Sequence, residues 1–345
     1  MRLLVLTQAV DLGDPVLGFF HGWLHEFSKH FERIAVVCLR EGEHELPQNV
    51  HVYSLGKEHG TSRLSYVTSF YRYAWRMRNE YDAVFVHMNQ EYVLLGSLVW
   101  KLLGKKVYLW RNHWAGSVFT RAAVALADGV FCTSKFSYTA KFAKTKLMPV
   151  GIDIELFRPV PNTTRSRSIL FLGRLAPSKR PDLFIEALET LASSGTAFSG
   201  DIYGDALPRD RDYRESLVAR VQKGKLASSV QFHTGVPNTE TPPIYSAHDI
   251  FINCSGSGMY DKTIFEAAAC GCIVLAESRD WGSVADARLS YKEGDANDLA
   301  KKIKELSALS ESEKEQLRKN CMALAQAQSL RSLAEGLVRT MQHTV

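Results

Sequence analysis

The chain of 345 residues lacks any unbroken apolar run near the ~18 residues that a membrane-spanning helix needs. Its best apolar segment, residues 92–103, is interrupted by Lys101. Its six cysteines form no CxxC pair, no His/Cys/Asp cluster has metal-ligand spacing, and no G-x-G-x-x-G follows the first apolar segment. These absences argue against a membrane-spanning protein, a small disulfide-rich domain, a metal centre and a dinucleotide-dependent oxidoreductase.

The composition is that of a globular chain. With 46% hydrophobic and 23% charged residues the chain can bury a core, and its length favours two domains. The apolar start before Asp11 is too short for a signal sequence and predicts a first strand. Unpaired cysteines in apolar segments are typical of a reduced, cytoplasmic setting.

The formal net charge of +5 lies entirely in residues 1–160, because basic and acidic residues balance in the rest of the chain. An ordinary solvated surface explains an excess of this size. Contact of the first half with a phospholipid surface or a lipid-phosphate acceptor is the alternative that stays open. The small excess and the lack of a recognition motif argue against a nucleic-acid partner.

Strand and helix patterns alternate along the chain, as is typical of parallel βαβ units. In the first half we expect strands at residues 3–7, 33–39, 50–54, 83–87, 107–110 and 129–132, and helices at 16–31, 62–79, 92–103, 120–126 and from Ser134. The polar stretch Pro159–Ser168 is the expected linker. Beyond it we expect strands at 169–172, 200–203, 230–233 and 250–253, and helices at 181–191, 213–222, 298–306 and 311–341.

This alternation predicts an α/β fold of two doubly wound parallel-sheet domains, Rossmann-like and facing a central cleft. Residues 1–160 form the first expected domain and residues 161–325 the second. Residues 326–345 are expected to form a helix that packs back on the first domain. Ligands of such sheets bind at the carboxyl ends of the strands, so the residues just after each strand are the candidates for a site.

The segment Asn253–Ser278 reads NCSGSGMYDKTIFEAAACGCIVLAES, a strand end, a Gly/Ser-rich loop, a helix of small residues and a buried strand. The loop Ser255–Gly258 is expected to leave backbone N–H groups free, and such a loop entering a helix is an anion site. The helix carries one carboxylate, Glu266, among alanines. A tight turn that feeds a buried helix is the alternative interpretation.

The segment Ile169–Leu188, ILFLGRLAPSKRPDLFIEAL, is more specific. A buried strand ends at Gly173, where the backbone can turn; Arg174 follows, and Lys179 comes shortly before a helix. Two cations at the ligand edge can bind a diphosphate and stabilise the negative charge that develops as a bond to it breaks. They would also make a metal unnecessary. For an isolated pair, a surface arginine and lysine would be the preferred interpretation.

Taken together, these segments resemble family 4 of the retaining glycosyltransferases, whose members have the GT-B fold. The resemblance rests on ADGVFCTSKFS (127–137), MPVGIDIELFRP (148–159), FLGRLAPSKRPDLFIEAL (171–188), DIYGD (201–205), FHTGVPNTETPPIYSAHDIFINCS (232–255) and TIFEAAACGCIVLA (263–276). It runs from about Lys105 to the C-terminal helix, whereas the residues before Lys105 match only in pattern.

The resemblance implies roles for individual residues. Arg174 and Lys179 would hold the nucleotide diphosphate, and Glu266 the ribose, since one carboxylate can accept from two vicinal hydroxyls. His113 would lie near the donor sugar on the acceptor-side domain. Further donor contacts are implied at Gly173, at the Thr263 backbone N–H for a phosphate, at Gly235 and Val236 for the base, and at Gly13 facing the phosphates.

One position departs from the family. Glu266 matches the second glutamate of a family element in which two glutamates lie eight residues apart. The first usually hydrogen-bonds the donor sugar, and this chain has Gly258 at that position. Three accounts are open, in this order of preference: an unusual donor sugar, replacement of the missing carboxylate by Asp261, or loss of activity.

The acceptor side is less defined. His87 ends a predicted strand and is either an acceptor contact or a core histidine, and Asp14 is a candidate contact for an acceptor hydroxyl. The predicted helix 62–79 mixes arginines with aromatic residues. Such helices lie on membrane surfaces, although aromatic residues at helical spacing also pack in cores.

The sequence thus predicts a hexosyltransferase of polysaccharide or glycolipid biosynthesis. It would move a sugar from a nucleotide diphosphate of the UDP or GDP type to a saccharide or lipid-linked acceptor, with retention and with neither metal nor another cofactor. The expected setting is cytoplasmic, with contact between the basic first domain and the inner face of the membrane as an open possibility. The alternative is a GT-B protein that binds nucleotide sugars without transferring them, or an epimerase.

Overall fold

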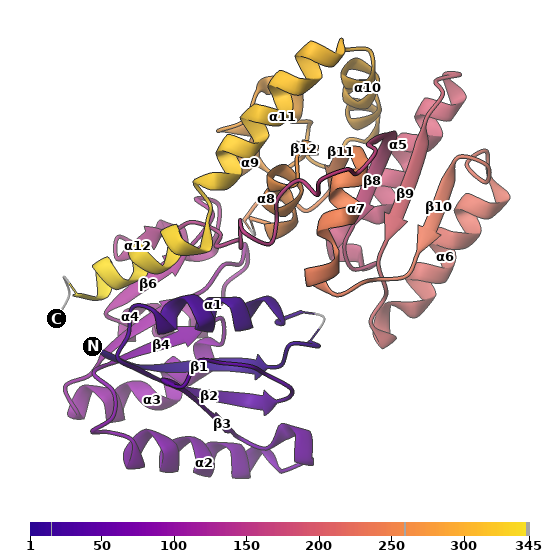
Figure 1. Ribbon diagram of the computed structural model, residues 1–345. Coiled ribbons are helices and arrows are strands. Elements are labelled where there is room, and N and C mark those ends of the chain that lie inside the picture. The colour runs from indigo at the N-terminus through magenta and orange to yellow at the C-terminus, as the bar shows by residue number, and fades with distance from the viewer. Residues whose placement is uncertain (15, 259, 343–345) are drawn as a thin grey trace. The chain divides into compact units, whose positions relative to one another are not determined.

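The computed structural model describes residues 1–14, 16–258 and 260–342 and divides the chain into two compact units (Figure 1). The first unit contains Met1–Gly151 and the chain from Leu330 onward, and the second contains Ile152–Ser329. The first boundary therefore precedes the stretch expected as a linker. Gly151 belongs to the first unit because its carbonyl accepts a hydrogen bond from Trp23 Nε1 (3.2 Å). A side chain does not fit there, since φ is +74° and a Cβ would lie 2.4 Å from Leu333.

The first unit contains a sheet of seven parallel strands in the order β3-β2-β1-β4-β5-β6-β7. Their bounds are β1 Arg2–Val10, β2 Arg33–Glu41, β3 Val50–Ser54, β4 Ala83–His87, β5 Lys106–Trp110, β6 Gly129–Cys132 and β7 Thr145–Leu147. In the central pairs, Leu3 of β1 lies opposite Ile34 of β2 and Ala83 of β4. Every residue of β4, AVFVH, is buried, as expected for a strand covered on both faces.

Helices cover both faces of this sheet (Figure 1). On one face, α1 (Phe19–Ser28) and α12 (Leu330–Gln342) share a core with alternate residues of β1 such as Leu3 and Val5. On the other, α2 (Arg63–Arg76), α3 (Gln90–Leu102) and α4 (Val118–Leu126) share a core with Leu4 and Leu6. The period-two alternation of β1 thus separates two cores, and the C-terminal helix completes one of them.

The second unit contains five parallel strands in the order β10-β9-β8-β11-β12. The strands are β8 Ser166–Leu172, β9 Ser199–Tyr203, β10 Val230–His233, β11 His248–Asn253 and β12 Ile273–Ala276. The helices are α5 Pro181–Ser193, α6 Arg211–Lys223, α7 Pro242–Ala247, α8 Lys262–Ala269, α9 Arg279–Gly282, α10 Ala296–Ser307 and α11 Glu311–Gln326. α5 packs against α6 and α10, and α8 packs against α7 and α11.

Two expected helices are wrong. Residues 138–141 form a single 3-10 turn before β7, because Thr139 donates from Oγ1 to Arg111 O (2.9 Å) and Thr145 from Oγ1 to Thr139 O (2.6 Å). Side-chain hydrogen bonds of this kind compete with a helix. The long tail helix is two helices, α11 and α12, because the carbonyl of Gln328 accepts from Ile152 N (3.0 Å) between them.

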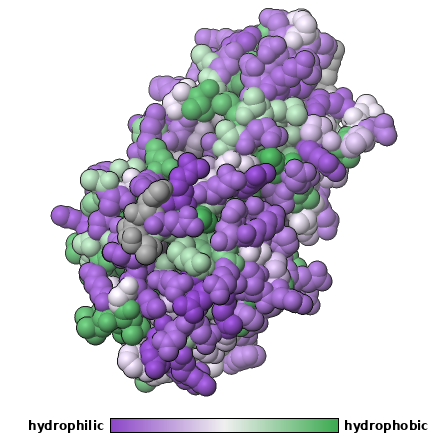
Figure 2. All heavy atoms as spheres, turned by 60° about the vertical axis from the view of Figure 1, so that its left-hand side comes forward, coloured by the Kyte–Doolittle hydropathy of each residue, from purple (hydrophilic) through white to green (hydrophobic). Residues whose placement is uncertain are grey.

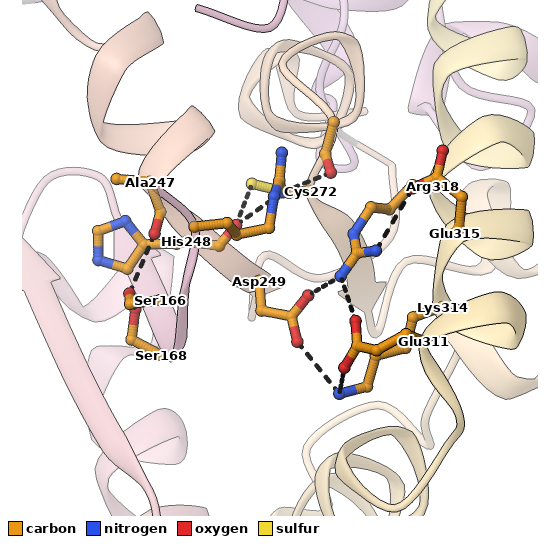
Figure 3. Close-up of polar contacts among 12 residues, drawn as sticks. Ser166, Ser168, Ala247, His248, Asp249, Cys272, Glu311, Lys314, Glu315 and Arg318 are labelled. Carbon is orange, nitrogen blue, oxygen red and sulfur yellow. Dashed lines mark hydrogen bonds and ion pairs between the residues drawn. The ribbon is translucent and has the colours of Figure 1, made fainter. Parts of the chain in front are cut away.

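A buried ion network ties α11 to the second sheet (Figure 3). Asp249, on β11, has Oδ1 2.5 Å from Arg318 Nη2 and Oδ2 3.4 Å from Lys314 Nζ, and both cations lie on α11. The Lys314 side chain is only 3% exposed and that of Asp249 7%. Each oxygen of this carboxylate therefore has a cation, which offsets the cost of burying the charges.

Candidate functional site

The carboxyl edge of the second sheet is shaped by a close approach of two strand ends. Gly173 follows β8 and Gly204 follows β9, and a Cβ on Gly204 would lie 1.9 Å from the carbonyl oxygen of Gly173. Gly204 is therefore required for packing, whereas a Cβ on Gly173 would meet nothing nearer than 4.0 Å. The backbone then places Arg174 at the edge, with Leu175 N bonded to Asp205 O (3.0 Å).

Arg174 is a half-buried cation whose charge is not neutralised locally. Within the described ranges, no residue forms an ion pair with its guanidinium or a hydrogen bond to it. A guanidinium presents its donors as a planar fork that suits two phosphate oxygens. Arg174 is thus positioned to bind an anion at the ligand edge.

Lys179 is held by a carboxylate from the other segment singled out in the sequence. It ends the short turn Pro177–Lys179, its ammonium is ion-paired with Asp261, and it lies 3.4 Å from Ser255 Oγ. Asp261 also accepts hydrogen bonds from Asn253 Nδ2 (3.2 Å) and Ser255 Oγ (2.9 Å). Burial acts to raise the pKa of Asp261, but the Lys179 charge and these hydrogen bonds outweigh it and lower the pKa to about 2. Asp261 is therefore ionised at neutral pH.

The same carboxylate caps α8. Asp261 Oδ1 accepts from the Thr263 backbone N–H (3.5 Å), and Thr263 Oγ1 accepts from Asn253 Nδ2 (3.1 Å). A negative charge at a helix N-terminus is stabilised by the helix dipole. The Thr263 N–H, which the resemblance implies as a donor to a phosphate, thus already donates to the Asp261 carboxylate. A phosphate placed there would contact the same two groups as Asp261, the Thr263 N–H and the Lys179 ammonium.

Glu266 lies on the buried side of α8 and is 3% exposed. Its Oε1 accepts from Asn238 Nδ2 (3.3 Å). Burial raises the pKa of Glu266, and the nearby Lys262 ammonium acts in the opposite direction; burial also lowers the pKa of Lys262. A carboxylate with one such hydrogen bond retains acceptor positions for further hydroxyl groups.

The loop Ser255–Gly258 differs from its prediction. Ser255 N donates to Asn253 Oδ1 (3.1 Å), and Ser257 N donates to Glu293 Oε1 (3.3 Å). The expectation of free backbone N–H groups is therefore wrong for Ser255 and Ser257, because side-chain acceptors near the loop already bind them. Gly258 is buried and has φ of +97°, a conformation that favours glycine.

Sequence reasoning missed Glu277 at this edge. It follows β12, is 3% exposed and accepts a hydrogen bond from Gly294 N (2.9 Å). Burial raises the pKa of Glu277 to about 7. Asn238 and Asn253, which support Glu266 and Asp261, were also missed. Asn253 ends β11 and Glu277 directly follows β12, so their positions at strand ends could have indicated them. No feature of the sequence indicated Asn238.

The loop after β10 contains the residues implied for a base. Gly235 N donates to Asp205 Oδ2 (3.0 Å), and a Cβ on Gly235 would lie 2.8 Å from that oxygen. Val236 is half-buried beside it in sequence. The hydrogen bond ties this loop to the loop that follows β9.

His113 and Gly13 lie in the first unit, each after a strand. His113 is half-buried, and its Nδ1 lies 2.9 Å from Ala115 N and 3.2 Å from Ala115 O. The ring stacks on Trp114 with centroids 5.6 Å apart. Gly13 N donates to Asp11 Oδ1 (2.9 Å).

The two predicted acceptor contacts both have structural partners. His87 is 1% exposed, stacks on Phe20 (4.1 Å between centroids) and has Nδ1 3.2 Å from Thr7 Oγ1. The structure therefore favours the core interpretation of His87. Asp14 is paired with Arg40 (2.5 Å) and accepts from two backbone N–H groups at the approach to α1.

In the part of the chain that the structure describes, no three His, Cys, Asp or Glu side chains are grouped so as to hold a metal ion. None of the described helices combines the length and the apolar character needed to cross a membrane. All six cysteines are buried as free thiols.

Comparison with known protein families gives two matches. A family described as glycosyl transferases group 1 matches residues 166–308, and one described as glycosyl transferase 4-like matches residues 13–129. D-inositol 3-phosphate glycosyltransferase of Kineococcus radiotolerans is 27% identical over 163 residues, which are 40% of this chain and 35% of that protein. The chain matches about a third of the length of such curated relatives.

Solved structures resemble the whole chain. HepE of Anabaena, crystallised with UDP, has a TM-score of 0.80 at 20% identity and covers 99% of this chain and 100% of its own. Sucrose-phosphate synthase of Thermosynechococcus elongatus has a TM-score of 0.80 at 18% identity, with 99% of each chain covered. These similarities confirm the predicted α/β fold of two parallel-sheet domains, the GT-B architecture.

Proposed function

This chain belongs to the glycosyl transferases group 1, family 4 of the glycosyltransferases, and we propose that it transfers a sugar from a nucleotide-diphosphate donor to a saccharide or lipid-linked acceptor. Transfer retains the configuration at the anomeric carbon and uses no metal. One observation carries the proposal. At the carboxyl edge of the second sheet, Arg174 follows β8 and has no ion-pair partner among the described residues, and the ion-paired Lys179 lies at the start of the helix that carries Glu266.

The chemistry assigned to these residues is electrostatic. Arg174 binds two oxygens of the diphosphate, and Lys179 adds a second positive charge. As the bond between the sugar and the diphosphate breaks, both cations stabilise the charge on the leaving group. Glu266 accepts hydrogen bonds from the ribose hydroxyls, while Gly235 and Val236 lie against the base. The departing diphosphate takes the proton of the acceptor hydroxyl, so no glycosidase-like carboxylate pair is needed.

His113 is assigned to the donor sugar and Gly13 to the phosphates. The tautomer of His113 that accepts from Ala115 N at Nδ1 has its N–H donor at Nε2. A sugar hydroxyl or ring oxygen is a suitable acceptor for that donor. The Gly13 position admits a close approach because it has no side chain.

A uridine donor is supported by the HepE structures, which contain UDP and UDP-glucose. GDP is the alternative nucleotide. Gly258 supplies no carboxylate to the donor sugar, and Asp261 is already engaged by Lys179, Asn253 and Ser255. This arrangement speaks against Asp261 as the replacement, so a donor other than the common hexoses is our preferred account.

The same glycine favours a second candidate function. A chain that lacks the sugar-facing glutamate can bind a nucleotide sugar and fail to transfer it, or it can act on the sugar without an acceptor, as an epimerase does. Binding without turnover over a broad donor panel would establish the first, and release of free sugar or of an epimer the second.

The test begins with nucleotide binding. Thermal unfolding is followed with UDP-, GDP-, ADP- and dTDP-sugars for the wild type, for Arg174→Gln and for Arg209→Gln, an exposed arginine after β9 that serves as control. A ligand at 100 times its Kd stabilises the native state by about 2.7 kcal/mol. We expect a shift with one nucleotide class in the wild type and the control, and its loss in Arg174→Gln. A wild type that responds to no nucleotide sugar would contradict the proposal.

Turnover completes the test. Arg174→Ala should lower transfer at least about 100-fold, because it removes a preorganised charge from the leaving group. Release of the nucleoside diphosphate in the presence of acceptor is the measurement. Unchanged turnover in this variant would overturn the assignment.

A further inference from the structure

The layer formed by α2, α3 and α4 has an unusual outer face. α3 contacts both neighbours: it packs on α4, and Tyr71 of α2 donates from its hydroxyl to Leu95 O (2.9 Å). Its inner side is filled by Val93 and Trp100, both 0% exposed. Its outer side presents leucines at positions 95, 98 and 102, which are 36%, 70% and 80% exposed. An amphipathic helix on a solvated surface carries polar residues there instead.

The neighbouring helix extends this apolar surface. Tyr71 and Trp75, one turn apart on α2, are 39% and 56% exposed, and the Arg78 guanidinium lies 4.9 Å from the centre of the Trp75 ring. We name the surface the leucine face and define it by Tyr71, Trp75, Leu95, Leu98 and Leu102. Figure 2 shows hydrophobic residues gathered at the lower left edge of the molecule among hydrophilic ones. Single exposed apolar residues are ordinary, but a contiguous group marks a contact surface.

The charges on the same helices are predominantly positive. α2, α3 and α4 contain a single carboxylate, Glu91, and five exposed basic residues: Arg63, Arg72, Arg76, Lys101 and Arg121. Within the described chain, none of these five cations is ion-paired with a carboxylate. Exposed cations that have no counter-charge in the protein are available to an external anionic surface.

We propose that the leucine face docks the chain on an anionic lipid bilayer. The leucines enter the boundary between headgroups and acyl chains, Tyr71 and Trp75 lie at the level of the headgroups, and the five cations contact anionic lipids. A second copy of the chain does not fit this face, because two such faces would bring like charges together. The face belongs to the first unit, whereas Arg174, Lys179 and Glu266 belong to the second, so the inference goes beyond the proposed function and stands without it.

The experiment measures co-sedimentation of the full chain with vesicles of phosphatidylglycerol and phosphatidylcholine in equal parts, or of phosphatidylcholine alone. We expect binding to the anionic vesicles only, and weaker binding as salt screens the charges. The variant Leu98→Ser/Leu102→Ser should bind at least about tenfold more weakly. Arg72→Gln/Arg76→Gln should bind roughly 25-fold more weakly at low salt, about fivefold for each cation.

Matched control variants alter the same kinds of residue elsewhere. Leu147→Ser/Val284→Ser removes two exposed apolar side chains, and Lys223→Gln/Lys225→Gln removes two exposed cations. Both should bind the anionic vesicles like the wild type. The nucleotide-induced thermal shift, measured on every variant, should be the same as in the wild type, which separates a failure of lipid binding from a failure of the proposed function.

Three results would overturn the proposal. The first is absence of binding to anionic vesicles, and the second is equal loss of binding in the controls and in the leucine-face variants. The third is a wild-type dimer or protein complex in solution that Leu98→Ser/Leu102→Ser dissociates while vesicle binding is unaffected, because the face would then serve a protein partner.

Discussion

The two units differ in whether their charged side chains are buried or exposed. Among the residues of the second unit whose burial the structure describes, five Asp, Glu, Lys or Arg side chains are buried: Asp249, Glu266, Glu277, Asp280 and Lys314. In the described part of the first unit no Asp, Glu, Lys or Arg is buried, and the basic excess lies on the surface. A buried charge costs several kcal/mol unless partners surround it. Buried charges therefore occur in the unit whose strand ends carry the networks around Lys179 and Glu266.

The two units present their cations to an anion in different ways. The second unit arranges a few cations at fixed points beside carboxylates, which suits a small ligand with a defined shape such as a diphosphate. The first unit spreads unpaired cations over a helical layer, which suits an extended anionic surface. If this difference is correct, changing a buried charged side chain of the second unit should alter the free energy of unfolding more than removing an exposed one of the first unit.

The largest effect is expected from the network in Figure 3. Asp249→Ala removes the buried counter-charge of Lys314 and Arg318 and leaves them only the exposed Glu311 and Glu315, so unfolding of the second unit should become easier by about 3–5 kcal/mol. Asp82→Ala removes an ion pair of the first unit whose side chains are 35% and 41% exposed, and it should cost under about 1 kcal/mol. Urea unfolding of both variants is the measurement. Equal losses of unfolding free energy in the two variants would contradict this difference between the units.

The next effect depends on pH. Burial raises the pKa of Glu277 from 4.5 to about 7, so between these values the folded chain binds a proton that the unfolded chain releases. This group therefore contributes stability below pH 4.5, and the contribution is lost as the pH rises through 7. The side chain in Glu277→Gln cannot ionise, so the free energy of unfolding of this variant should exceed that of the wild type by up to about 3 kcal/mol at neutral pH.

Urea titrations of the wild type and Glu277→Gln at about pH 5 and about pH 8 measure this difference. Glu313→Gln is the control, and its pH dependence should have the opposite sign. Hydrogen bonds from Ser310 lower the pKa of Glu313, so the contribution of Glu313 to stability is lost as the pH falls. Parallel stability profiles for Glu277→Gln and the wild type would contradict the assigned environment of Glu277.

The smallest effect concerns Asp261. Asp261→Asn keeps an N-cap for α8 but removes the counter-charge of Lys179, so the unliganded chain should lose about 1–2 kcal/mol. A bound diphosphate would then supply the missing negative charge without meeting the Asp261 carboxylate. The nucleotide-induced thermal shift should therefore be larger than in the wild type. A smaller shift would mean that Asp261 serves the donor site by positioning Lys179.

Much of the second unit was predictable because its signals are local. Gly173, Arg174 and Lys179 follow one apolar run, and Glu266 sits in one helix, so spacing along the chain indicated their neighbourhood. The partner of Lys179 was not predictable, since Asp261 is 82 residues away in sequence. In the first unit the family signal began only near Lys105, and His87, chosen from its strand end alone, lies in the core.

The sequence by itself determined the alternation of apolar strands and helices, and with it the two parallel sheets and the edge where ligands bind. These properties follow from short-range patterns of hydrophobicity and from turn residues. Only the tertiary structure decided which charges are paired: Asp261 is engaged by Lys179, Glu277 is buried, and the five cations of α2, α3 and α4 have no ion-paired carboxylate among the described residues. Coulomb energy and desolvation depend on distance and burial in space, and neither is encoded in the spacing of residues along the chain.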